Sequence, residues 1–516
     1  MKFKKSAEVD SSHYRINSKK KNKPVITIQG NNIILDFKGA ILQGSNDKNS
    51  PDQYYGTAIQ IKKGNNITIR NLKIQGYARA IEAKNIEGLK IENCEITDHF
   101  RRPPETFQTF RNELYSRVHI HSQLNNSIQL KDCRNFEITN CKARANENVL
   151  MLESCSGVLV VNNDFSFNSG AALILNSTNN SQVLYNRFNF NVADTLLPGS
   201  ASIVLEGKSH SNLIYKNSIT HSANGIMATD VPEKNATNDT RNIIMENDLS
   251  YSFQNGIYCE HSKAIINKNR IYQSVNGVRS VSPVDQVIGN NQFRYNQTAI
   301  DISGSGKATI HHNIFFEDVA ALRIYTHENS KENKPGNRKA LIVANSFNRN
   351  RLVFHLGSID SLAEFTNIYQ QYDTLYWPEN AESKVNIPEN EDLLVALSED
   401  LVPVPKVNQN QNPFKGNGRF AGRHFLVTGK WGPYDFSYPL ARVDGTDRDS
   451  LIKISVLGPE GEWSVGEIKG YEVVSISGKE LPAIMIIRRI PEANPVLKLE
   501  FIPATGIRNK IVFGPF

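Results

Sequence analysis

The sequence predicts an all-β solenoid, and three observations support that prediction. An asparagine recurs along the middle of the chain, most often at intervals of 22 or 23 residues. A large apolar residue stands two positions after each asparagine, and a short aliphatic run precedes it. Short runs rich in Val and Ile, without any helical periodicity, are typical of strands. A unit of this length buries its apolar side chains only by stacking on copies of itself.

We interpret the recurring asparagines as a structural ladder. They are Asn163, Asn186, Asn217, Asn247, Asn269, Asn291, Asn313 and Asn345. Stacked at the inter-strand spacing of roughly 4.8 Å, their amides can both donate and accept hydrogen bonds, which satisfies polar groups that would otherwise be buried unpaired. Leu72, Cys94 and Cys141 occupy the equivalent position in earlier units, so we expect the ladder to begin after them.

Two units show the repeat most clearly: Lys216-Asn217-Ser218-Ile219 with Asn224-Gly225-Ile226, and Glu246-Asn247-Asp248-Leu249 with Asn255-Gly256-Ile257. They resemble the repeats of right-handed parallel β-helix proteins. That group includes pectate- and alginate-lyase-like enzymes, β-helical glycoside hydrolases, mannuronan epimerases and the periplasmic accessory protein of nitrous oxide reduction. The resemblance covers roughly residues 24 to 357. It implies a fold and not one activity, because a single fold hosts many chemistries.

The repeat pattern divides the chain into four parts. Residues 1–23 are basic and polar, and we expect them to cap the open end of a right-handed parallel β-helix over 24–378. Residues 379–418 are polar and contain prolines, as expected of a linker. From 419 to 516 the chain alternates between strand-like runs and turns such as Asp444-Gly445, which predicts a small C-terminal β-sandwich.

Composition limits the partners and the cellular location. The net charge of +7 over 516 residues is modest, and it slightly favours an anionic glycan over a neutral one. We expect a polysaccharide or oligosaccharide substrate and no nucleic acid, while the sequence does not indicate an oligomeric state. No run is long and apolar enough for a membrane span, and no signal peptide follows the basic start. The resemblance implies an extracytoplasmic protein, periplasmic or secreted, whose signal has been removed.

The five cysteines give no sign of a metal site or a redox motif. They are Cys94, Cys133, Cys141, Cys155 and Cys259. Their spacing contains no CxxC, and we expect buried reduced thiols. No calcium-binding cluster of aspartates is evident either, so we expect neither metal nor cofactor.

Three insertions interrupt the repeat and predict the walls of a cleft over the middle of the solenoid. The largest runs from Asp98 to Asn126, and the others span Asn191 to Ser200 and Val231 to Arg241. Long loops in compact proteins are often functional. The first insertion carries Arg101, His119 and His121, side chains that can bind carboxylates and sugar rings. A solvated basic loop is the alternative interpretation.

In the last strand of each unit, side chains alternate between the core and the outer face. With residues such as Ile226 and Ile257 inward, the outward residues form two columns, which we expect to be the floor of the site. The first column is Glu82, Gln129, Met151, Ile174, Val204, Met227, Tyr258, Arg279, Asp301 and Arg323. The second column is Lys84, Lys131, Glu153, Asn176, Glu206, Thr229, Glu260, Val281, Ser303 and Tyr325.

The second column places three glutamates on alternate coils, and these are the main catalytic candidates. Glu153, Glu206 and Glu260 are then about 9 to 10 Å apart, two inter-strand spacings. That separation is at the upper edge of the roughly 6.5–9.5 Å used for inverting glycoside hydrolysis. Asp230 and His221 lie near the same strand and add a second carboxylate and a possible base. Solvated surface carboxylates are the alternative interpretation.

The pattern therefore predicts a glycoside hydrolase with a carboxylate acid and base. A polysaccharide lyase or epimerase acting on a uronate is the alternative, and it requires cations that neutralise the uronate carboxylate. The candidate substrate-binding residues are Arg101, His119, His121, Lys131, Tyr258, Arg279 and Arg323. A non-catalytic glycan-binding or accessory β-helix is the third possibility.

Overall fold

The structure is a computed structural model, and it describes most of the first 378 residues together with a set of later strands. The described ranges are 1–18, 23–47, 50–102, 125–191, 201–230, 241–252, 254–281, 283, 286–304, 306–325, 338–357, 361–378 and the strands β38 to β46 between 426 and 513. The chain divides into two compact units, Met1–Val404 and Pro405–Phe516.

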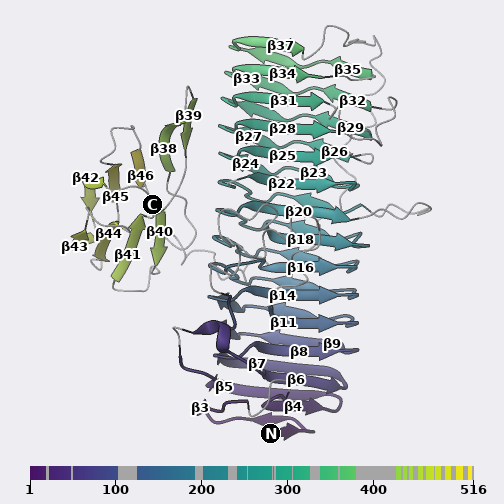
Figure 1. The fold of residues 1–516 in the computed structure, drawn as a ribbon, viewed down its shortest axis with the longest axis vertical. Coiled ribbons are helices and arrows are strands. Elements are labelled where there is room, and N and C mark those ends of the chain that lie inside the picture. The colour runs from purple at the N-terminus through teal and green to yellow at the C-terminus, as the bar shows by residue number, and fades with distance from the viewer. Residues whose placement is uncertain are drawn as a thin grey trace. The chain divides into compact units, whose positions relative to one another are not determined.

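The first unit is a parallel β-helix, in which strands from successive coils pair side by side (Figure 1). The first sheet contains β1 (Lys2–Phe3), β4 (Ile26–Gln29), β6 (Thr57–Lys63), β8 (Arg79–Lys84), β11 (Asn126–Lys131), β14 (Asn148–Glu153), β16 (Leu173–Asn176), β18 (Ala201–Gly207), β20 (Asn224–Asp230), β22 (Asn255–Glu260), β25 (Asn276–Val281), β28 (Thr298–Ser303), β31 (Ala320–Tyr325), β34 (Leu352–Leu356) and β37 (Thr374–Pro378). The predicted all-β, β-helical fold class is confirmed.

Two further sheets run along the solenoid, and the third sheet begins only at β24 (Arg270–Tyr272). The second sheet contains β2 (Ala7–Glu8), β3 (His13–Arg15), β5 (Ile33–Gln43), β7 (Asn65–Gln75), β9 (Glu87–Glu92), β10 (Glu95–Thr97), β12 (Glu137–Thr139), β13 (Lys142–Arg144), β15 (Leu159–Val161), β17 (Gln182–Leu184), β19 (Leu213–Tyr215), β21 (Ile243–Met245), β23 (Ile265–Asn267), β26 (Gln286–Gly289), β29 (Gly306–His311), β32 (Arg338–Val343) and β35 (Ser361–Phe365). The third contains β24 (Arg270–Tyr272), β27 (Gln292–Arg294), β30 (Ile314–Phe316), β33 (Ser346–Asn348) and β36 (Ile368–Gln370). One short 3-10 helix, η1 (Pro51–Gln53), interrupts the early coils.

The asparagine ladder runs as the sequence predicts. In Asn186 the backbone N–H and the side-chain Nδ2 both donate to Oδ1 of Asn217, at 2.9 and 3.0 Å, and Nδ2 also donates to the carbonyl of Val160. Asn217 repeats this pattern toward Asn247. The same contacts extend one coil beyond the prediction, to Asn367.

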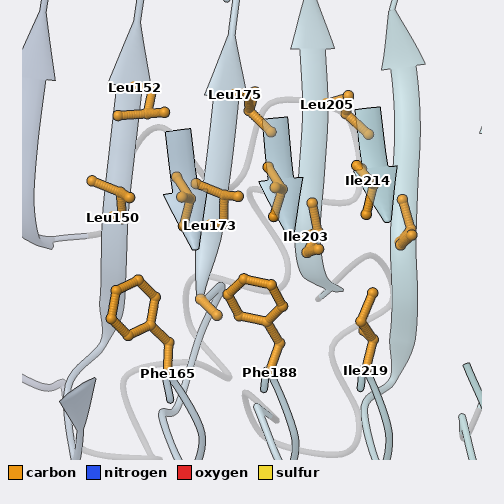
Figure 2. Close-up of a cluster of buried hydrophobic side chains, with 14 of the residues drawn as sticks. Leu150, Leu152, Phe165, Leu173, Leu175, Phe188, Ile203, Leu205, Ile214 and Ile219 are labelled. Carbon is orange, nitrogen blue, oxygen red and sulfur yellow. The ribbon is translucent and has the colours of Figure 1, made fainter. Parts of the chain in front are cut away.

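The core consists of rows of like side chains stacked along the solenoid. Figure 2 shows Leu150, Leu173 and Ile203 in one row and Phe165 with Phe188 in another. All five are fully buried. Each such side chain contributes about 1.5–3 kcal/mol by leaving water, so every coil is stabilised by its neighbours.

Each coil closes its turn before the ladder asparagine with a residue in the left-handed region. Lys216, Glu246 and Lys268 have φ of 52°, 54° and 54°. None of them is glycine, and this conformation is unfavourable for most side chains. The two hydrogen bonds that the following asparagine donates within the buried ladder hold that turn in place.

A second turn in each coil has the same design and forms a second, shorter ladder. Nδ2 of Asn146 donates to Oδ1 of Asn168, and Nδ2 of Asn168 donates to Oδ1 of Asn191, both at 3.0 Å. Further along, the N–H and Nδ2 of Asn296 both donate to Oδ1 of Asp318 at 2.8 Å. This second ladder was not predicted from the sequence.

The N-terminal residues extend the solenoid. Lys2 pairs with Thr27 in the first sheet, and β2 and β3 pair in parallel with β5. The described part of residues 1–23 therefore lies at the end of the β-helix, where we expect a cap, and its role as a cap stays a prediction.

The second unit contains two antiparallel sheets. They comprise β38 (Leu426–Trp431), β39 (Tyr434–Ser437), β42 (Gly461–Lys469), β45 (Val496–Pro503) and β46 (Lys510–Phe513) in one sheet, and β40 (Ala441–Asp444), β41 (Leu451–Val456), β43 (Tyr471–Ser477) and β44 (Ala483–Arg489) in the other. That the two sheets pack as a sandwich stays a prediction. The predicted linker, 379–418, lies outside the described residues.

Across the described ranges, no helix is long and apolar enough to span a membrane.

Candidate functional site

The outer face of the first sheet carries the two predicted columns in the predicted register. In the first column, Tyr258 pairs with Arg279, and the pairing continues through Asp301 to Arg323. In the second column, Lys131 pairs with Glu153, and Glu153 with Asn176. The ladder therefore fixes which side chains face outward along the whole sheet.

The middle of this outer face is apolar and buried, which differs from the open cleft floor expected there. Met151, Ile174, Val204 and Met227 point outward by register, yet none is more than 6% exposed. Together with Ala171 and Ala201 they form a hydrophobic cluster of their own, and Tyr258 packs at its edge. Burying these apolar side chains removes them from water, and this stabilises the folded protein.

Glu206 lies within this buried region. It is 1% exposed, and its Oε1 accepts a hydrogen bond of 3.0 Å from Nδ2 of Asn176. Thr229, on the next coil, is 8% exposed. In this arrangement Glu206 is shielded from solvent, whereas Glu260, two coils further along the same column, is only half-buried.

Glu153 and Lys131, which are two of the predicted site residues, form an ion pair across adjacent coils. The hydrogen bond from Lys131 to Glu153, followed by the charge of Glu153, raises the pKa of Lys131. The pair is partly exposed and lies four coils or more from Glu260, so the structure does not bring it to the same place.

His221 belongs to the second turn and not to the outer column. It is 1% exposed, has a φ of 60°, and its ring stacks between Phe190 and Tyr251, with centroids 4.1 and 5.1 Å away. Phe167 extends the same stack, 4.9 Å from Phe190. His221 thus occupies an aromatic position of the repeat.

The remaining predicted residues lie at or beyond the edges of the described ranges. Arg101 is half-buried, and the adjacent Arg102 pairs with the buried Glu147, with Nε 3.4 Å from Oε1. His119 and His121 lie outside the described residues. Asp230 ends β20, but its side chain is also outside the described set.

Six polar residues lie together on four consecutive coils, β22, β25, β28 and β31. We call them the polar strip: Tyr258, Glu260, Arg279, Asp301, Arg323 and Tyr325. The Tyr258 hydroxyl donates to Oε2 of Glu260 at 3.2 Å. Nε of Arg279 lies 3.9 Å from Oδ2 of Asp301. The guanidinium of Arg323 lies over the Tyr325 ring, 4.2 Å from its centroid.

The two phenols of the polar strip are protonated at neutral pH. Burial, followed by the nearby Glu260 carboxylate, raises the pKa of Tyr258. Burial, followed by the charge of Asp301, raises the pKa of Tyr325. Both hydroxyls are therefore hydrogen-bond donors and possible acids.

Arg279 is a partly accessible cation of the strip. Its side chain keeps 36% of its surface exposed, whereas that of Asp301 keeps 4%. A partly exposed guanidinium beside a carboxylate and a phenol can bind a ligand carboxylate and stabilise negative charge that develops on it.

The polar strip joins three predicted residues that bind substrate, Tyr258, Arg279 and Arg323, with one predicted catalytic residue, Glu260. Sequence reasoning placed Asp301 and Tyr325 in the two columns but did not select them. The signal that could have found them is the run of charged and aromatic residues on consecutive coils after Tyr258.

Two family models match the solenoid. Residues 58–240 match the right handed beta helix region, and residues 199–350 match the periplasmic copper-binding protein (NosD) family. Among the described residues, no three His, Cys, Asp or Glu side chains are grouped so as to hold a metal ion.

Several solved structures are similar at low sequence identity. The A-module of mannuronan C-5 epimerase AlgE6 from Azotobacter vinelandii has 10% identity and a TM-score of 0.43, covering 69% of this chain and 91% of its own. A PL6 alginate lyase in complex with a trisaccharide has 13% identity and a TM-score of 0.43, covering 67% and 80%. The adhesin PfbA of Streptococcus pneumoniae has 15% identity and a TM-score of 0.34, covering 55% and 72%. No curated protein matches the sequence significantly. At these low sequence identities, the similarity concerns the fold and does not assign an activity to this protein.

Proposed function

We propose that the protein, whose residues 58–240 match the right handed beta helix region, acts on a polysaccharide at the polar strip. The proposed reaction is removal of the proton next to the carboxylate of a uronate unit, leading to elimination or epimerisation. The observation that supports this most directly is the hydrogen-bonded pair of Glu260 and Tyr258 beside the partly exposed Arg279.

Each of these three side chains has a role in the proposed reaction. Arg279 binds the uronate carboxylate and stabilises the enolate that forms when the proton leaves. Glu260 accepts that proton through Oε2. Tyr258, kept protonated by burial and by Glu260, donates a proton to the leaving oxygen on the same face of the sugar in elimination. Epimerisation requires a proton donor on the opposite face of the carbon, which Tyr258 does not supply because its hydroxyl is hydrogen-bonded to Glu260.

Glycoside hydrolysis is the second candidate. It is favoured by the column that Glu153, Glu206 and Glu260 share on alternate coils, because two inter-strand spacings separate neighbouring carboxylates by about 9 to 10 Å. The burial of Glu206 disfavours it, because a second carboxylate that activates water needs access to water. A non-catalytic glycan-binding protein is the third candidate, and it requires the arginines but no base.

We also propose an extracytoplasmic location. The support comes from the NosD family, whose description is periplasmic, and which matches residues 199–350.

Replacing Glu260 by Gln separates these functions. For an eliminating or epimerising enzyme we expect Glu260→Gln to lower kcat by about 10²-fold or more, because the base is lost, with little change in the urea midpoint of unfolding. Arg279→Gln should lower kcat/KM for uronate polymers and leave neutral glycans unaffected. The measurements are ultraviolet absorbance of unsaturated uronate products and NMR of the polymer for epimerisation.

Glu137→Gln is the matched control, because Glu137 lies on β12 in a different sheet. Full turnover in Glu260→Gln would contradict the proposed role of Glu260 as the base. If Glu206→Gln lost turnover in the same experiment, glycoside hydrolysis would be the favoured function. Binding without turnover in the unmodified protein, across a panel of acidic and neutral glycans, would leave the non-catalytic function.

A further inference from the structure

The third sheet carries a row of arginine and aromatic side chains that the proposed reaction does not use. Five of them define what we call the Arg–aromatic face: Tyr272, Arg294, Tyr295, Phe316 and Arg349. They belong to β24, β27, β30 and the turns that follow β27 and β33. The polar strip, by contrast, belongs to the first sheet.

Arg294 is the centre of this face. Its guanidinium lies 5.5 Å from the ring centroid of Tyr272 and 5.5 Å from that of Phe316. Among the described residues, Arg294 forms no ion pair with a carboxylate, and its Nε has no hydrogen-bond partner. The rings orient this cation, and among the residues that the structure describes no carboxylate neutralises its charge.

Arg349 extends the positive charge toward the C-terminal coils. Its guanidinium lies 5.8 Å from the Phe316 ring centroid, donates to Gln371 at 2.9 Å and pairs with Glu317 at 3.2 Å. The side chain of Arg349 is 55% exposed. The arginine is therefore held in place by its neighbours and still open to a ligand.

Exposed rings and amides surround these cations. Tyr295 is 44% exposed, and its ring meets Phe316 edge to face at 6.0 Å. A shallow hollow at the end of the face is lined by Phe316, Asn348, Arg349, Gln370 and Gln371. Aromatic rings suit the apolar faces of sugar rings, amides suit hydroxyl groups, and arginines suit carboxylates.

We infer that the Arg–aromatic face is a second binding surface for an acidic polysaccharide, laid along successive coils of the third sheet. A polyuronate is favoured over a neutral glycan because Arg294 has no carboxylate partner in the described part of the chain. A polyuronate is also favoured over an aromatic or apolar partner, because arginines and side-chain amides lie between the aromatic rings of this face. The inference shares the acidic-glycan class with the proposed function, but it depends on different residues.

The test is binding of size-defined polygalacturonate and alginate oligosaccharides by calorimetry, with the full chain and in the Glu260→Gln background to prevent turnover. We expect Arg294→Ala with Arg349→Ala to weaken binding by about 10-fold or more. Arg294→Lys keeps the charge but cannot stack between two rings, so it should show a smaller loss. Added salt should weaken binding to the unmodified protein.

Glu317→Gln gives a test in the opposite direction. It removes a carboxylate that competes for Arg349, so we expect about 3-fold tighter binding of the acidic oligosaccharides. This variant also guards against misfolding as an explanation, since a gain of affinity requires a folded face.

The outcomes distinguish this inference from the proposed function. If Arg279→Gln retains binding that Arg294→Ala with Arg349→Ala loses, the Arg–aromatic face is supported, whatever the polar strip does. Unchanged affinity in Arg294→Ala with Arg349→Ala overturns the inference, and so does equal affinity for neutral cello-oligosaccharides. If only Arg279→Gln loses binding, the glycan binds at the polar strip and the inference is overturned.

Discussion

Replacing Asn269 by Ala should lower the free energy of unfolding by about 4 kcal/mol. Asn269 is fully buried in the middle of the ladder. Its Oδ1 accepts from the N–H and the Nδ2 of Asn247 at 2.9 and 3.1 Å, and its Nδ2 donates to Asn291 and to the carbonyl of Ile244. Alanine removes all four contacts at once.

The size of the effect follows from what is left behind. The N–H of Asn247 loses its acceptor, and the Ile244 carbonyl loses a donor. Each buried polar group without a partner costs ~1–3 kcal/mol, and the missing amide also leaves a small cavity.

The measurement is the urea midpoint of unfolding followed by circular dichroism. Asn267→Ala is the matched control, because Asn267 is only half-buried and its Oδ1 accepts a single side-chain hydrogen bond, from Asn290. We expect the control to change stability by less than about 1 kcal/mol. An equal loss of unfolding free energy in the two variants would contradict a stabilising role of the buried ladder.

Replacing Asp318 by Asn should stabilise the protein, and the gain should grow as the pH rises. Asp318 stands in the second ladder, where its neighbours Asn296 and Asn350 use Nδ2 to donate to the carbonyls of Ile271 and Phe315. The corresponding atom in Asp318 is Oδ2, which is buried and has no hydrogen-bond partner among the described residues. A protonated carboxyl can replace the amide at this position, but a carboxylate cannot donate.

Burial raises the pKa of Asp318 from 3.8 to about 8. Between these two values the folded protein holds a proton that the unfolded chain releases, so the free energy of unfolding falls as pH rises. Below pH 4 the carboxyl is protonated in both states, and the effect vanishes. Over the roughly three units from pH 4 to pH 7, at 1.36 kcal/mol per unit, the loss reaches about 4 kcal/mol.

Asn at this position does not titrate, so the stability difference between Asp318→Asn and the unmodified protein should grow by this amount over that range. The measurement is the urea midpoint of both proteins at several pH values from 4 to 9. Asp373→Asn is the control, because the Asp373 side chain is 73% exposed. A constant difference between Asp318→Asn and the unmodified protein at every pH would contradict a buried neutral carboxyl.

The repeat could be predicted from the sequence because the features that set it are local and periodic. The position of Asn217 in its unit determines its contact with Asn247, and the alternation along the strand then determines that Tyr258 and Arg279 face outward. The second ladder escaped detection because Asn, Ser and Asp all occur at its position, as in Asn168, Ser274 and Asp318. Several side chains can accept the same backbone N–H, so no single letter marks it.

The site could be predicted only in part. Alternation tells which residues leave the core, but it does not tell whether the outer face meets solvent. Glu206 is outward by register and still 1% exposed. His221 falls close to the strand in sequence, yet its left-handed turn directs the ring into a stack with Phe190.

The amide-to-amide hydrogen bonds of the main ladder all point the same way along the solenoid. Each side-chain amide donates to the amide of the next coil, from Asn163 through to Asn367. Aligned amide dipoles add, and each bond polarises its neighbours. The row therefore acts as a single long dipole, with its positive end toward the C-terminal coils. Arg349 follows Asn345 in the sequence and therefore lies on the last coils of the ladder, nearest this positive end.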